Sequence, residues 1–242
     1  MLGDLLRKLA IAHRILEMEG HGDMTLGHLS ARDPEGRGFW MKRNAIGLGE
    51  VSGPEDFVLL SFDGNQLEGS GRPHSEWPIH AQIYLGRDDI AVVAHTHPFH
   101  ACVFSASDAP LQAVTLEANY FDLPVPRYDN AAALIRSVSL GDEIAAALGD
   151  GFAVLMANHG VTFCGTSVEH ATMMGIFLEK ACKAQLAIAA SGLPWSPLDA
   201  RVEAERRDQI MTGVHIDHSW RFFVRKLEAQ SGGQPLFGGS GS

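Results

Sequence analysis

The stretch Ile90–Pro98, with the sequence IAVVAHTHP, decides how this chain folds. Its first five residues are all apolar, which is typical of a buried strand, and two histidines follow directly. Because strand side chains alternate between the two faces of a sheet, His95 and His97 are expected to project to the same side. Two neighbouring imidazoles at the end of a buried strand supply half of a metal site.

A third candidate ligand closes another apolar run about sixty residues later. His159 follows the segment VLMAN at 154–158 and precedes Gly160. Taken singly, each histidine is more simply a packed core or surface residue, but three at strand ends favour a shared role. Three neutral imidazoles and an open position are an arrangement that catalytic divalent metals use. We therefore expect one divalent ion per subunit, and zinc, manganese, iron and cobalt all suit such ligands.

Length and charge limit the function. A chain of 242 residues can bury a substantial core in one or at most two domains. No run of about 18 apolar residues exists, so no membrane span is predicted. The formal net charge of −10 argues against binding to nucleic-acid backbones. The start of the chain predicts an amphipathic helix and not a signal peptide. The three cysteines are widely spaced, which suggests reduced thiols in a cytoplasmic protein.

Helical and strand patterns alternate along the chain without any internal repeat. Ser75 and Ser167 are expected to cap two of the helices, and residues 63–65 (DGN) predict a hairpin turn. Helices are expected at 5–16, 75–84, 134–148 and 167–190, from Asp199 onward, and briefly after Pro98. Strands are expected at 24–32, 39–41, 57–60, 90–94, 152–156 and 161–164.

Short strands with helices interspersed favour an α/β sandwich with a largely antiparallel sheet. The alternative, a doubly wound parallel sheet, would need regular spacing of strands and helices, and the chain has no dinucleotide or phosphate-loop motif. We expect a single domain at 1–230. The remainder, 231–242, is rich in Ser and Gly and predicts a flexible tail whose last residues resemble a linker.

Four motifs together resemble the class II aldolase and adducin family in their order and spacing. They are GHLSAR at 27–32, SEW at 75–77, HTHP at 95–98 and NHG at 158–160, and the resemblance covers residues 5–225. It implies a three-layer α/β/α fold with a nine-stranded sheet. It also implies a homotetramer with active sites between subunits, acting on a small-molecule substrate.

The same resemblance implies roles for particular residues. His95, His97 and His159 would hold the metal ion, with Glu76 as the carboxylate beside it. Tyr120 stands where the family takes a proton-donating tyrosine from the neighbouring subunit. The adducin branch of the family keeps the fold but has lost metal ligands, whereas none is missing here. This difference favours an enzyme.

The residues themselves indicate what such a site would do. A metal on three imidazoles keeps its full charge, because no thiolate offsets it, and would polarise a chelating pair of substrate oxygens. It would thereby stabilise the negative charge left when a neighbouring carbon–carbon bond breaks. Glu76 would then move the proton as general acid or base. The simpler interpretation of Glu76 is an acid at a helix start.

Departures from the phosphate-binding pattern of the family bear on the substrate. His28, Arg43 and His74 replace small and hydroxyl residues, while Ser30 and Ser75 persist. Bulk together with a planar cation suits a flat carboxylate, which arginine can bind bidentately. The pattern resembles the decarboxylase branch, which acts on hydroxylated aromatic dicarboxylates such as 3-hydroxy-2-methylpyridine-4,5-dicarboxylate or a dihydroxyphthalate.

Other functions stay open. An aldolase acting on a sugar, a sugar phosphate or another hydroxy-keto substrate is the first alternative, and an epimerase or dehydratase the next. A cupin-like metal enzyme is disfavoured, because its carboxylate follows the histidine pair within a barrel. A non-catalytic, adducin-like interaction module would bind no metal.

The remaining histidines have simpler interpretations. His80 lies on the helix face of Glu76 and could support the site, although helix packing is the simpler role. His100 is expected to pack. His218 is assigned to the substrate because the resemblance implies that the C-terminal helix closes the site, although a solvated helix end is the simpler role.

Overall fold

The middle layer of the protein is one mixed sheet. The computed structural model describes residues 2–130, 134–211 and 213–232. Among these residues the sheet has eight strands, and not the nine that the resemblance implied. The strands are β1 (His28–Arg32), β2 (Phe39–Lys42), β3 (Phe57–Leu60), β4 (Gln66–Glu68), β5 (Val92–Thr96), β6 (Arg127–Tyr128), β7 (Ala153–Met156) and β8 (Gly160–Gly165).

The strand order is β4-β3-β2-β1-β5-β8-β7-β6, and every neighbouring pair is antiparallel except β6 with β7. β5, the strand of the two histidines, therefore lies at the centre between β1 and β8. Its side chains enter the hydrophobic cores on both faces of the sheet, which is why an unbroken apolar run forms it.

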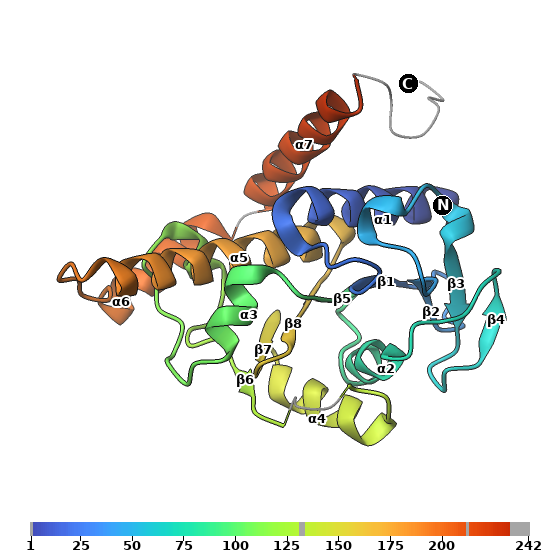
Figure 1. Cartoon of the computed structure of the whole chain (residues 1–242), viewed down its shortest axis with the longest axis horizontal. Helices are drawn as coiled ribbons and strands as arrows, with labels where there is room; N and C mark the ends of the chain where they lie inside the picture. Colours follow the sequence, from blue (N-terminus) through green and yellow to red (C-terminus); the bar gives the residue numbers. More distant parts are fainter. Residues whose placement is uncertain (1, 131–133, 212, 233–242) are drawn as a thin grey trace.

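Helices cover both faces of the sheet (Figure 1). One face carries α1 (Leu2–Leu16), α3 (Phe99–Ser105), α5 (Val168–Ser191) and α7 (Gly213–Gln230), which share a hydrophobic core. The other face carries α2 (Trp77–Gly86) and α4 (Val138–Leu148), with a second core. The remaining helix, α6 (Ala200–Ile210), follows α5 and precedes α7 in the chain. The expected three-layer, largely antiparallel α/β fold is confirmed.

Strand alternation decides which side chains meet α2. Leu29 and Ala31 of β1 enter the core beneath α1 and α5. His28 and Ser30 alternate with them and face α2, where Ser30 meets Tyr84. In the antiparallel register of β1 and β5, His28 lies directly opposite His95. The sheet thus brings a histidine of the first strand beside the metal-strand histidine.

Several expected boundaries need correction. The strand expected at 24–32 begins only at His28, because Leu26 N–H donates to Asp23 C=O at 2.8 Å and closes a turn. Ser75 does not cap α2, since the N-cap is Glu76 and makes no capping hydrogen bond with its side chain. The helix expected from residue 134 begins at Val138, where the Ser137 side chain accepts a hydrogen bond from the Leu140 amide.

Other boundaries agree with the sequence. Ser167 accepts the His170 N–H and caps α5, and Asp199 accepts the Arg201 N–H and caps α6. α1 runs into a distorted turn in which Gly20 adopts a φ of 86°, a conformation that favours glycine. Of the expected tail 231–242, residues 233–242 lie outside the described part of the chain. Among the described residues, no helix combines the length and apolarity needed to cross a bilayer.

Candidate functional site

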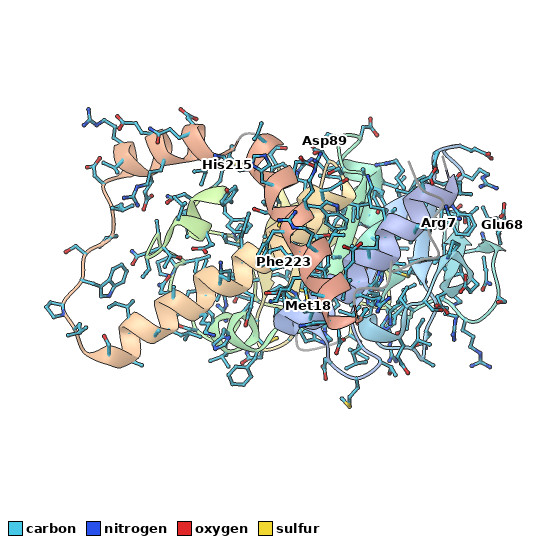
Figure 2. The ribbon with its side chains drawn as sticks, turned by 90° about the horizontal axis from the view of Figure 1, so that it is seen from above. Arg7, Met18, Glu68, Asp89, His215 and Phe223 are labelled. Atoms are coloured by element: carbon cyan, nitrogen blue, oxygen red, sulfur yellow. The ribbon has the colours of Figure 1, made fainter. Side chains whose placement is uncertain are left out.

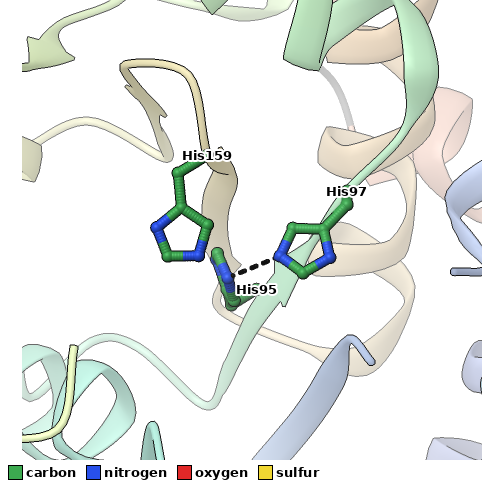
Figure 3. Close-up of side chains that lie close together, drawn as sticks. All are labelled: His95, His97 and His159. Carbon is green, nitrogen blue, oxygen red and sulfur yellow. Dashed lines mark hydrogen bonds between the residues drawn. The ribbon is translucent and has the colours of Figure 1, made fainter. Parts of the chain in front are cut away.

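The two histidines of the β5 end face each other through their Nε2 atoms. His95 Nε2 and His97 Nε2 lie 3.1 Å apart (Figure 3). The opposite nitrogen of His95, Nδ1, is 3.1 Å from the Val161 carbonyl, which can only accept a hydrogen bond. His97 Nδ1 is 3.2 Å from Asp23 Oδ2, another acceptor. In the neutral rings both protons therefore sit on Nδ1, and two bare Nε2 atoms face each other.

His159 completes the group from the turn between β7 and β8. Its ring lies 4.9 Å from that of His95 and 5.5 Å from that of His97, centroid to centroid. Figure 3 shows the three rings converging, and their ligand atoms form one group within 4.8 Å. Both ring nitrogens of His159 are buried and have no hydrogen-bond partner. The structure therefore brings together the three histidines that the sequence singled out.

These nitrogens fit a divalent metal ion. Two lone pairs 3.1 Å apart repel each other, and a cation between them removes that cost. Burial lowers the pKa of His95 well below its usual value, and burial is also the largest cause of the lowered pKa of His97. Both rings are therefore neutral near pH 7, which is the form that binds metals.

Glu76 lies at the centre of the site and is 3% exposed. Its Oε2 is 3.9 Å from His95 Nε2, and its Oε1 is 3.8 Å from His159 Nε2. The Oε1 atom also accepts the Ile135 N–H at 2.9 Å, which fixes the carboxylate in place. Glu76 is the N-cap residue of α2, and this start of the helix lies near the end of β5.

Two further buried imidazoles, those of His28 and His74, belong to the surroundings of Glu76. His28 Nε2 is 4.0 Å from Glu76 Oε2, and the His28 and His74 rings are 4.0 Å apart. Burial lowers the pKa of His74 to about 4, so that this ring is neutral as well. His28 Nε2 and His74 Nδ1 are buried without a hydrogen-bond partner. Together with Glu76 they make a second group of possible ligand atoms within 4.8 Å.

Ser30 and Arg43 are not placed as substrate contacts. Ser30 is fully buried, and its Oγ lies 2.7 Å from His80 Nδ1 and 2.9 Å from the Tyr84 hydroxyl. Arg43 directs Nε and Nη2 at Asp56 Oδ1, both at 3.1 Å, so its charge is already paired. Two of its donor nitrogens thus serve Asp56, and a bidentate grip of Arg43 on a substrate stays a prediction.

Tyr120, His218 and Ser75 were also expected to take part in the reaction or to contact the substrate. Tyr120 is 6% exposed and stacks on Phe177 of α5 at 4.2 Å, and its role as proton donor at a neighbouring site stays a prediction. His218 is exposed on α7, the helix on which Figure 2 labels His215 and Phe223. Ser75 is exposed beside Glu76. For His218 and Ser75, contact with the substrate stays a prediction.

The sequence did not single out Asp23 as a site residue. It stands in the turn before β1, where no periodic pattern marks it, and only the folded chain brings it to His97. A cavity of about 660 Å³ opens beside the metal cluster. Its lining includes Asp23, His97, Phe99 and His159.

His100 was expected to pack. Its Nδ1 atom instead lies 2.6 Å from Glu179 Oε1, so the ring pairs with a carboxylate.

Comparisons with known proteins agree with this geometry. The family model of the class II aldolase and adducin N-terminal domain matches residues 7–186. The 3,4-dihydroxyphthalate decarboxylase of Arthrobacter keyseri is 27% identical over 238 residues, which cover 91% of this chain and 93% of that protein. An aldolase II superfamily protein from Pseudomonas syringae has a TM-score of 0.83 at 27% identity and covers 95% and 93% of the two chains. L-Fuculose 1-phosphate aldolase from Glaciozyma antarctica PI12 has a TM-score of 0.81 at 25% identity, with 96% and 92% covered.

Proposed function

Because this chain belongs to the class II aldolase and adducin family, we propose that it is a divalent-metal-dependent carbon–carbon lyase. One observation carries the proposal: two bare Nε2 atoms, of His95 and His97, face each other at 3.1 Å beside the unpartnered ring of His159. An interaction module would have no reason to keep three neutral imidazoles in this arrangement.

The substrate that we propose is a hydroxylated aromatic dicarboxylate, such as a dihydroxyphthalate or 3-hydroxy-2-methylpyridine-4,5-dicarboxylate. His28 and His74 support this class, because two flat, neutral rings beside the cluster suit a planar substrate. The decarboxylase of Arthrobacter keyseri, whose name gives 3,4-dihydroxyphthalate as its substrate, adds support at 27% identity. In the reaction, the bond from the ring to one carboxylate breaks, CO2 leaves, and a proton takes its place on the ring carbon.

The side chains divide the work between them. His95, His97 and His159 would hold the ion, and a bound divalent ion supplies the Lewis-acid polarisation of the substrate oxygens. Glu76 would hold a proton at Oε2 and pass it on, since Oε1 is already engaged by the Ile135 amide. Burial of Glu76 and the imidazoles keeps water away, which strengthens these electrostatic effects.

A direct assay tests this function. Protein of measured metal content is incubated with 3,4-dihydroxyphthalate, with 3-hydroxy-2-methylpyridine-4,5-dicarboxylate and with L-fuculose 1-phosphate, and CO2 and aldehyde are measured separately. We expect CO2 from a dicarboxylate and little aldehyde from the sugar phosphate. The His97→Ala protein is the matched control. No turnover of any of these compounds by the fully metal-loaded protein would count against a lyase of this kind.

Aldol cleavage of a sugar phosphate or another hydroxy-keto compound is the second candidate. The likeness to the Glaciozyma antarctica aldolase favours it, because the whole fold is shared at a TM-score of 0.81. Rapid aldehyde release without CO2 in the same assay would reverse our ranking. A non-catalytic module would purify without metal and would lose nothing when a chelator is added.

We also propose that the chain assembles as a homotetramer with sites between subunits. α7 leaves apolar side chains in solvent, with Val214 60% and Phe222 52% exposed, and an interface would cover them. Light scattering coupled to gel filtration gives the mass directly, and a monomer at micromolar concentration would contradict the assembly.

Two smaller proposals concern location and metal. The three free thiols agree with a cytoplasmic location. The bound ion is zinc, manganese, iron or cobalt, and elemental analysis identifies it.

A further inference from the structure

A chain of hydrogen bonds beneath α2 determines which nitrogen of His28 carries its proton. The Tyr84 hydroxyl donates to the Ser30 carbonyl at 3.0 Å, and a carbonyl can only accept. Tyr84 therefore has no proton left for the Ser30 hydroxyl, so this hydroxyl, at 2.9 Å, donates to the Tyr84 oxygen. The Ser30 proton is used in turn, and Ser30 Oγ accepts from His80 Nδ1–H at 2.7 Å.

The neutral His80 ring then has a bare Nε2, which can only accept. His28 Nδ1 lies 2.7 Å from this atom and must donate to it. Both rings are fully buried, and burial lowers the pKa of each, so neither carries a second proton near pH 7. His28 therefore presents Nε2 as a lone pair. His95 and His97 are arranged in the same way, with their protons on Nδ1.

The lone pair of His28 Nε2 faces a carboxylate. Glu76 Oε2 lies 4.0 Å from it, while the other oxygen, Oε1, accepts the Ile135 N–H. Two electron-rich atoms at this separation repel each other when the carboxylate is ionised. His28 Nε2 is buried and has no hydrogen-bond partner in the described part of the chain. A cation between the two atoms would turn this repulsion into attraction.

His74 completes a set of ligands for such a cation. One of its ring nitrogens lies within 4.8 Å of the ligand atoms of His28 and Glu76. All three side chains are buried, and among the described residues His74 Nδ1 has no hydrogen-bond partner either. Two imidazoles and one carboxylate are a ligand set that zinc and ferrous iron use. Glu76 Oε2 is also 3.9 Å from His95 Nε2, so one oxygen faces both groups of histidines.

We propose that His28, His74 and Glu76 form a second divalent-cation site, which shares Glu76 with the first site and inhibits turnover when it is filled. Glu76 Oε2 cannot hold a proton while it binds a cation, because ligand atoms must be deprotonated. The ion also occupies the place beside His28 and His74 that a planar substrate would take. For the effect on turnover, but not for the binding of the ion, the inference rests on the proposed function.

The second site should bind its ion more weakly than the first. It has two imidazoles in place of three, and Glu76 has to serve both sites. Besides burial, the positive charges of Lys42 and Arg136 contribute to the lowered pKa of His74, and the same charges oppose a cation there. Purified protein should therefore carry about one ion per chain, in the first site, and the second site should fill only with excess metal.

A metal titration counts the sites without any turnover. Chelator-treated protein is titrated with zinc by calorimetry, and elemental analysis after dialysis against excess zinc gives the ions bound. We expect about two ions per chain, with the second bound at least about tenfold more weakly than the first. His28→Leu and His74→Leu should each bind about one ion with the affinity of the first site. A single ion in the saturated wild type, or two ions in both variants, would overturn the proposal.

Two further variants separate the site from general packing. His13→Leu removes another fully buried histidine, which is bonded to the Leu9 carbonyl and the Leu29 amide, and should keep both ions at a lower stability. His80→Leu removes the acceptor of the His28 Nδ1 proton and should weaken the second ion alone, about 10- to 100-fold. Loss of the second ion in His13→Leu as well would reduce the effect to packing and overturn the proposal.

The inhibitory effect is measured against the activity of each protein at one equivalent of zinc, which fills the first site. In the wild type, filling the second site should lower CO2 release at least about 100-fold, since proton transfer by Glu76 is blocked. His74→Leu should show no such fall relative to its own activity at one equivalent. Undiminished release from wild type with both ions bound would overturn the inhibitory role. If no substrate is turned over, the proposed function fails, while the titration still decides whether the second site exists.

Discussion

The carboxylate of Asp23 accepts a hydrogen bond from His97 Nδ1 at 3.2 Å, which leaves His97 Nε2 bare and facing His95 Nε2. A turn before β1 thus prepares a ligand at the end of β5. The Val161 carbonyl does the same for His95 from the neighbouring strand β8. Each imidazole therefore donates its Nδ1 proton to an acceptor outside the cluster.

The Asp23→Ala variant should bind the metal about 10- to 100-fold more weakly, since the loss of an outer partner frees the ring and its tautomer. Competition with a fluorescent zinc chelator measures the change in affinity. Glu179→Gln is the matched control, because Glu179 pairs with His100, which is not one of the ligands. Unchanged affinity in Asp23→Ala would mean that Asp23 has no part in preparing His97.

Removal of a ligand itself should have a larger effect. His97→Ala should purify with much less bound metal and should lose its lyase activity, because one of the three imidazole ligands is removed and a water would have to fill its position. Elemental analysis of the purified variant, beside the wild type treated identically, gives the answer. If His97→Ala retained a full equivalent of metal, the assignment of the three ligands would be wrong.

The Glu76→Gln variant separates proton transfer from structure. The Gln carbonyl can still accept the Ile135 N–H, so the melting temperature should stay close to that of the wild type. Loss of a general acid or base should lower kcat about 10²- to 10⁴-fold. Steady-state kinetics with metal content measured in the same samples tests this expectation. A kcat within about twofold of the wild type would remove Glu76 from proton transfer.

The sequence predicted those parts of the site that lie on strands and helix starts. The period of two along β5 and its apolar run were enough to place His95 and His97, and the run before His159 placed the third ligand. Asp23 could not be found in this way, because its role depends on a turn that folds back onto His97. Ser30 was assigned to the substrate by its motif, yet the face that it shares with His28 directs it towards His80 and Tyr84.

The role of Arg43 could not be read from its residue type. A guanidinium suits a carboxylate, but the nearby Asp56 already binds two of its nitrogens, Nε and Nη2. Similarly, the aromatic ring of Tyr120 found a partner in Phe177 and became part of the core. In each case the side chain's partner comes from a distant segment or from a loop such as 52–56. The local sequence pattern therefore does not predict the contact.

The pairing of Arg43 leads to a kinetic prediction. Arg43→Ala should change KM for a dicarboxylate substrate and for phthalate inhibition by less than about twofold, because the guanidinium is engaged with Asp56. It should instead lower stability slightly, since Arg43 is partly exposed and such an ion pair contributes about 1 kcal/mol. Asp56→Asn is the companion variant. A rise in KM in Arg43→Ala that is specific to dicarboxylates would restore its role as a substrate contact.

Buried neutral histidines also predict how stability depends on pH. Burial lowers the pKa of His13 to about 3, far below the value of about 6.5 in an unfolded chain. Below about pH 6.5, His13 binds a proton in the unfolded chain but stays neutral in the folded protein. The stability contributed by this residue is therefore complete above about pH 6.5 and is lost as the pH falls towards 3.

The size of this effect for one histidine is about 1 kcal/mol between about pH 6.5 and about pH 5.5. Urea unfolding of chelator-treated protein at both pH values gives the free energies of unfolding. His13→Asn, which cannot titrate, should lose about 1 kcal/mol less than the wild type over this interval, although its stability is lower throughout. The other buried histidines contribute equally to both proteins and cancel in the difference. The same pH slope for the two proteins would mean that folded His13 takes up the proton as readily as the unfolded chain does.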